Sequence, residues 1–248
     1  RLSATSVMTT TRHWPEEAKR IARLRDRIAV GVHLDLTLGT PLGPIASLAP
    51  QGKLPDVGAL TKLALLGRID RGEVAAEFGR QLARFEDALG HPPDHIDGHQ
   101  HVHALPGVRE ALIEALARRA YANPPLIRVP TDTPGAILSR GRATTKALTL
   151  AALARGFRAA VVGAGYPVND TFAGVSGFAA DGVAADFRAG RAHAGPLHIL
   201  MCHPGLVDDE LVRLDPVTDR REAELQTLMA DDALAGLIWR PQRAADGA

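Results

Sequence analysis

Apolar residues recur along much of this chain at every third or fourth position, and shorter runs of aliphatic residues separate these segments. The first spacing predicts amphipathic α-helices, because it places the apolar side chains on one face of a helix. The short aliphatic runs predict buried β-strands. The clearest helix covers residues 72–89, and Gly90 ends it. Its apolar positions are spaced by three and four: Val74, Phe78, Leu82, Phe85 and Leu89.

Helical and strand-like segments alternate, which predicts an α/β fold with a mostly parallel sheet. We expect helices over residues 14–25, 56–66, 72–89, 106–119, 144–162, 183–189 and 219–234. We expect strands over residues 28–38, 95–103, 126–129 and 197–202. Reactive side chains fall near the ends of several strands, which favours a (β/α) barrel with its active site at the carboxyl face. No glycine-rich phosphate loop follows the first strand, which disfavours an open doubly wound sheet.

Four of the ten histidines lie between residues 95 and 103, together with an aspartate. In an extended strand alternate side chains share a face, which would place Asp97, His99, His101 and His103 on one side. Imidazole is the commonest metal ligand and carboxylate a frequent partner, so this side is a candidate metal and acid–base surface. We place Asp97 and His103 at the substrate site. A solvated polar turn is the alternative interpretation.

Other strand ends carry four further candidates. His33 lies among valines and leucines; alone it is typical of a core histidine, but the second histidine cluster favours a metal ligand. Asp35 follows on the same face and either orients His33 or is structural. Arg128 is a lone cation in an apolar strand and pairs with a carboxylate of the protein or of a substrate. His203 precedes Pro204 and is a candidate general acid, with a turn histidine as the alternative.

Composition excludes several classes of function. The net charge is +1, from 29 basic and 28 acidic residues, and no basic stripe with aromatic residues points to nucleic acid. The single cysteine, Cys202, forms no disulfide within the chain, is expected in the core and favours a cytoplasmic location. No apolar run is long enough for a transmembrane helix, and no signal peptide is visible.

Residues 31–37, 95–103 and 201–205, taken together, resemble the YdjC-like carbohydrate deacetylases. Residues 169–175 are similar to the branch of that family associated with hopanoid biosynthesis. The resemblance implies an α/β fold, a distorted (β/α) TIM-like barrel that forms one domain over residues 1–248. Residues 1–9 resemble the family's second strand, so the domain is expected to lack the first βα unit and its Asp-Asp motif. An open barrel edge would favour a homodimer.

The resemblance also implies the chemistry. His33 and His99 would bind a divalent metal ion (Mg, Zn, Co or Mn), His203 would be the catalytic acid, and Arg128 would lie at the substrate site. The expected function is a metal-dependent hydrolase that removes an N-acetyl group from an amino sugar or glycolipid, in hopanoid biosynthesis. The alternative is a non-catalytic remnant that binds a sugar or a partner and lacks the N-terminal aspartates. Phosphoester hydrolysis would need more clustered cations than Arg128 provides.

Overall fold

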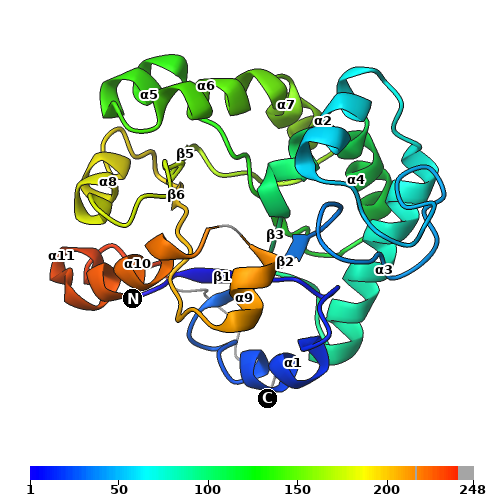
Figure 1. Cartoon of the computed structure of the whole chain (residues 1–248), viewed down its shortest axis with the longest axis horizontal. Coiled ribbons are helices and arrows are strands. Elements are labelled where there is room, and N and C mark those ends of the chain that lie inside the picture. The colour runs from blue at the N-terminus through cyan, green and yellow to red at the C-terminus, as the bar shows by residue number, and fades with distance from the viewer. Residues whose placement is uncertain (216, 240–248) are drawn as a thin grey trace. The chain divides into compact units, whose positions relative to one another are not determined.

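The computed structural model describes residues 1–215 and 217–239 (Figure 1). These residues form two compact units. The N-terminal unit is built from residues 2–128 and 156–168, and the C-terminal unit from residues 129–155 and 169–238. Compact units of this kind can belong to one domain, so the single domain over residues 1–248 stays a prediction. No helix within the described ranges is long and apolar enough to cross a membrane.

A four-stranded parallel sheet forms the centre of the N-terminal unit, in the order β1-β2-β3-β4. Its strands are β1 (Ala4–Val7), β2 (Ala29–Leu34), β3 (His95–Gly98) and β4 (Leu126–Ile127). β2 and β3 come unusually close at Gly31. A Cβ atom there would lie 2.6 Å from two atoms of the His95 ring, so the strands pair in this way only because glycine has no side chain.

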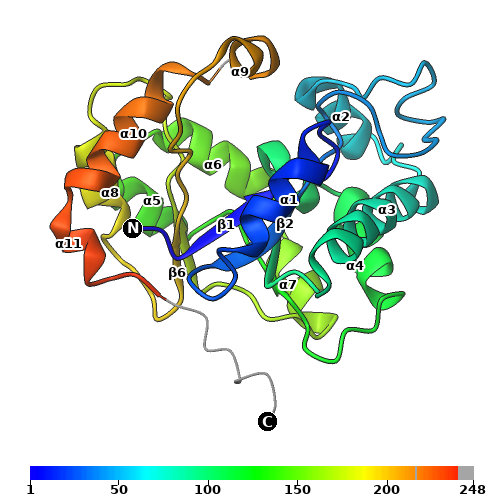
Figure 2. The same ribbon diagram turned by 90° about the horizontal axis from the view of Figure 1, so that it is seen from below.

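Helices cover this sheet. They are α1 (Trp14–Ala22), α2 (Val57–Leu65), α3 (Arg71–Leu89), α4 (Val108–Ala117) and α7 (Phe157–Gly163), with the 3₁₀ helix η1 (His99–Ala104). The Asp70 side chain accepts a hydrogen bond from the backbone N–H of Glu73 and so begins α3, which ends at Gly90 with φ 74°. α3 lies beside α4 (Figure 1, Figure 2), and Phe78 and Phe85 of α3 are fully buried.

The C-terminal unit contains a two-stranded parallel sheet and mostly short helices. Its strands are β5 (Thr171–Ala173) and β6 (His198–Leu200). Its helices are α5 (Pro134–Arg140), α6 (Thr144–Leu153), α8 (Val183–Gly190), α9 (Asp209–Leu214), α10 (Asp219–Ala230) and α11 (Asp232–Ala235). α10 packs against α8, and Phe187 of α8 is among the largest buried side chains.

The predicted α/β class with a parallel sheet is confirmed. Within residues 1–215 and 217–239 the strands pair in two sheets, neither of which closes on itself, so the distorted barrel and its missing first unit stay predictions. The single helix expected over 144–162 is wrong, because the chain breaks between α6 and α7, where Gly156 adopts φ 81°. The sequence reading also missed α5, β5 and α9.

Candidate functional site

The histidine-rich segment leaves the sheet after Gly98. Gln100 has φ 50° and His101 has φ 62°, a left-handed conformation that side chains other than glycine rarely adopt. The chain therefore turns into η1, and the alternation of faces ends with β3. The prediction that Asp97, His99, His101 and His103 share one strand face is wrong for this reason. A strained turn of this kind often accompanies a functional site.

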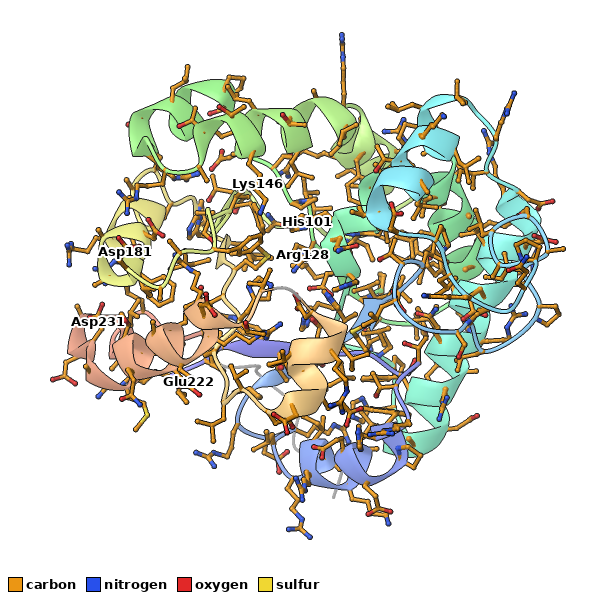
Figure 3. The ribbon with its side chains drawn as sticks, in the orientation of Figure 1. His101, Arg128, Lys146, Asp181, Glu222 and Asp231 are labelled. Carbon is orange, nitrogen blue, oxygen red and sulfur yellow. The ribbon has the colours of Figure 1, made fainter. Side chains whose placement is uncertain are left out.

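Arg128 holds this turn from both sides. Its Nη2 donates to the carbonyl oxygen of Gly98 at 3.2 Å and to Nδ1 of His101 at 3.3 Å (Figure 3). Its own carbonyl oxygen accepts a hydrogen bond from Nε2 of His103 at 2.8 Å. Because arginine has only donors, His101 Nδ1 must be the acceptor, and the proton of the neutral ring lies on Nε2. Burial and the Arg128 charge both lower the pKa of His101 well below its usual value.

Asp97 lies at the centre of the site with both carboxylate oxygens in use. Oδ1 lies 2.6 Å from Nδ1 of His33, and Oδ2 lies 2.6 Å from Nη1 of Arg128 and accepts from the Ser6 hydroxyl at 3.1 Å. His33 and Asp97 are register partners on β2 and β3, which brings their side chains to one face. Burial alone would raise the pKa of Asp97, but the charges of Arg128 and His33 hold it well below its usual range.

The ionised carboxylate fixes the tautomer of His33. An ionised aspartate only accepts hydrogen bonds, so His33 Nδ1 donates to it, and whenever the ring carries a single proton its lone pair lies on Nε2. Metal-binding histidines commonly donate a hydrogen bond to such a carboxylate from the ring nitrogen that does not bind the metal. The His99 ring stands edge-on to the His33 ring, with centroids 5.6 Å apart and planes at 72°. The structure thus brings together the two histidines that the sequence reading proposed as ligands.

These residues fit part of a divalent metal site. Two neighbouring imidazoles, one with its proton position fixed by Asp97, are suitable donors for the cation that the resemblance implies. Across residues 1–215 and 217–239, no group of three or more His, Cys, Asp or Glu side chains is arranged to hold a metal ion. Metal binding by His33 and His99 therefore stays a prediction.

His103 is part of the core in this structure. It is fully buried, and its ring packs edge-on against Phe157 with centroids 5.3 Å apart. Burial and the Arg128 charge lower the pKa of His103 to about 3, so the ring is neutral. The substrate contact predicted for His103 would require this ring to become exposed. Arg128 is also buried and pairs with a carboxylate of the protein, which is one of the two alternatives left open for it.

Asp35 holds the loop after β2. Its Oδ1 accepts from the backbone N–H groups of Thr37 and Leu38 at 2.9 and 3.0 Å, the pattern of an Asx turn. Its Oδ2 accepts from the Thr10 hydroxyl at 3.4 Å. Burial raises the pKa of Asp35 to about 6, although the backbone hydrogen bonds oppose this. These contacts support the structural role considered for Asp35.

His203 belongs to the C-terminal unit and follows β6. Its backbone N–H donates to the carboxylate of Glu224 on α10. Cys202, the residue before it, has its pKa raised to about 12 by burial and by the Glu224 charge, so its thiol stays protonated and is no nucleophile. The sequence reading missed Glu224 and Ser6. An arginine four residues before Glu224 was the available signal, because such a spacing forms ion pairs on a helix.

Comparison with known proteins gives the same family that the sequence motifs resemble. The family model described as "YdjC-like protein" matches residues 1–237. A mouse protein named "Carbohydrate deacetylase" is 41% identical over 106 residues, which cover 41% of this chain and 34% of that protein. A "Chitooligosaccharide deacetylase" of Enterobacter sp. (strain 638) is 36% identical over 107 residues, 43% of this chain and 42% of that protein. The matches therefore span less than half of these relatives' length.

Among solved structures, the "putative cellobiose-phosphate cleavage protein" of Enterococcus faecalis V583 resembles this chain with a TM-score of 0.66. The superposition covers 95% of this chain and 82% of that one, at 19% sequence identity. At this level of identity the likeness concerns the fold alone.

Proposed function

Because the chain belongs to the YdjC-like protein family, we propose that it acts as a carbohydrate deacetylase, a hydrolase that removes the acetyl group from an N-acetylated sugar. The names of its relatives support this reaction. The observation that carries the proposal is the hydrogen-bonded set of His33, Asp97 and Arg128 beside His99.

A divalent cation is part of the proposal. His33, through Nε2, and His99 would hold it. When bound, such a cation would polarise the acetyl carbonyl and lower the pKa of a water molecule. The donor set does not select among Mg, Zn, Co and Mn.

Each neighbouring residue has a role that follows from its contacts. Asp97 keeps Nδ1 of His33 protonated and so keeps the lone pair of Nε2 available to coordinate a metal ion. Arg128 holds Asp97 ionised and supports the turn that carries His99. Ser6 donates a further hydrogen bond to Asp97. We propose that His203 protonates the departing amine, as a general acid.

For the substrate we propose an N-acetylated amino sugar or a glycolipid bearing one. The similarity of residues 169–175 to the hopanoid-associated branch is the reason to include the glycolipid, and the single cysteine remains the reason to expect a cytoplasmic enzyme. A homodimer is a further expectation.

Acetate release tests the proposal. The full-length protein, freed of metal and then titrated with Mg, Zn, Co or Mn, is assayed on N-acetylated chitooligosaccharides and on an N-acetylglucosaminyl lipid. We expect metal-dependent acetate release that His33→Asn reduces by about 10²-fold or more, whereas His13→Asn, an exposed control, has no effect. Absence of acetate release with every metal and both substrates would overturn the proposed activity.

A second candidate is a sugar-binding protein without turnover. The observation in its favour is that the described residues contain no complete three-ligand group. Calorimetry beside the acetate assay separates the two candidates, because a binding protein would show affinity for the sugar without releasing acetate.

A further inference from the structure

The loop that carries His203 is bonded along α10 at alternate residues. The N–H of His203 donates to the Glu224 carboxylate, the N–H of Gly205 to the carbonyl oxygen of Arg221 at 3.2 Å, and the N–H of Val207 to Oε1 of Glu222 at 3.4 Å. One side of residues 203–207 therefore follows the helix. Only the bond from His203 reaches a buried charged acceptor.

Glu224 is a carboxylate fixed in the interior of the C-terminal unit. It is 3% exposed, and its partner Arg220, one helical turn earlier, is 4% exposed. Oε1 of Glu224 accepts from Nε of Arg220 at 2.6 Å, which leaves Oε2 for the N–H of His203. Arg220 is itself held by Asp186 of α8, 2.8 Å from its Nη1, and by the carbonyl oxygen of Ala179 at 3.1 Å.

A buried ion pair of this kind is not explained by stability alone. The desolvation of two charges offsets most of their attraction, and apolar side chains of similar size often do as well. What the pair provides here is a rigid acceptor, because Arg220 fixes the carboxylate from one side and α8 fixes Arg220. The group held by this arrangement is the backbone of His203.

We propose that Glu224 is the positioning residue for His203, and that the Arg220–Glu224 pair sets where the imidazole of His203 stands. The inference rests on the proposed function, in which His203 protonates the leaving amine. An imidazole is joined to its backbone by two rotatable bonds, so a shift of the backbone N–H moves the ring directly. A displacement of about 1 Å at a reacting group can reduce the rate by about 10²-fold.

Glu224→Gln is the decisive variant. The amide keeps the size of the carboxylate, but an NH₂ group replaces one of its two oxygens, so only one of the two positions that face Arg220 and His203 can still accept a hydrogen bond. We expect kcat to fall by about 10²-fold while KM changes by less than about threefold. Glu222→Gln, on the exposed face of the same helix (Figure 3), is the matched control and is expected to change kcat by less than about twofold.

A double-mutant comparison distinguishes positioning from general damage. If Glu224 acts through the His203 ring, Glu224→Gln lowers kcat in the native protein but causes no further loss in a His203→Asn background. A further loss of tenfold or more in that background would overturn the proposal, because it would show that Glu224 contributes by a route that does not involve the imidazole.

The backbone amide signal of His203 in a ¹H–¹⁵N spectrum gives a readout that does not depend on activity. We expect a downfield, slowly exchanging proton that moves upfield in Glu224→Gln and stays unchanged in Glu222→Gln. An amide that does not respond to Glu224→Gln overturns the positioning role, whereas a native protein without acetate release overturns the proposed function. If Glu224→Gln does not fold, Arg220→Lys is tested: the amide shift and kcat should change together, and a change in one alone contradicts the proposal.

Discussion

Asp97→Asn tests whether one carboxylate holds the N-terminal site together. The substitution removes the negative charge and leaves the Arg128 guanidinium buried, with a side chain only 7% exposed. For charge centres about 4 Å apart at an effective dielectric constant of about 20, the lost attraction is about 4 kcal/mol. Removal of one partner from a buried ion pair typically costs about 3–5 kcal/mol, which is the same range. We therefore expect the free energy of unfolding to fall by about 4 kcal/mol.

Urea unfolding at pH 7, followed by the fluorescence of the buried Trp14, measures this change. Arg128→Met in the Asp97→Asn background should restore about 2 kcal/mol, because it removes the uncompensated charge. Glu16→Gln is the control: it breaks an exposed pair with Lys19 and should cost less than about 0.5 kcal/mol. A cost of less than about 1 kcal/mol for Asp97→Asn, or no recovery in the double variant, would refute the reasoning.

The sign of the pH dependence gives an independent check on the same residue. Asp97 has a pKa well below that of an unfolded chain, so its contribution is present above about pH 4 and is lost as the pH falls below that value. Asp97→Asn should flatten the acid side of the stability curve. A curve with an unchanged acid slope would contradict an ionised, paired Asp97.

Three further changes have expected outcomes that the same unfolding assay can check. The pKa of His103 is lowered to about 3 in the folded protein, so the unfolded chain binds a proton first as the pH falls through about 6.5. This should lower the free energy of unfolding by about 2 kcal/mol between pH 7.5 and pH 5, and His103→Gln should remove this pH dependence. The pKa of Asp35 is raised to about 6, so its ionisation opposes folding as the pH rises through about 4 to 6. Asp35→Asn, which keeps the acceptor for Thr37, should therefore raise the free energy of unfolding by about 1–3 kcal/mol at pH 8 relative to its effect at pH 4. A loss of stability at pH 8 would contradict this. Phe85→Ala should cost about 3–5 kcal/mol, because Phe85 is fully buried beside Trp14, and a cost below about 1 kcal/mol would argue against that packing.

Local sequence was sufficient for the elements whose signals lie within them. The helix that begins after Asp70 and ends at Gly90 carries its own cap, apolar stripe and stop signal, and the structure confirms it within a residue. The neighbourhood of His33 and Asp97 also follows from the sequence, because two parallel strands bring their carboxyl ends to one edge of the sheet.

The turn after Gly98 could not be predicted in the same way. Residues 95–103 read as a strand, and what ends the strand is an arginine about 30 residues later that bonds Gly98 and His101. Glu224 was missed for a similar reason, since its partner His203 lies 21 residues earlier and the contact is made through the backbone. A backbone contact leaves little trace in the identity of the residue that donates it.

The close approach at Gly31 restricts how this protein can diverge. Any larger residue there would push β2 away from β3, and the displacement would reach His33 and Asp97 two positions further along the paired strands. A lineage that replaces His33 can lose its chemistry and keep its sheet. A lineage that replaces Gly31 would have to rebuild the strand pairing and the site at once, so substitutions at this glycine are more constrained than those at the reactive side chains beside it.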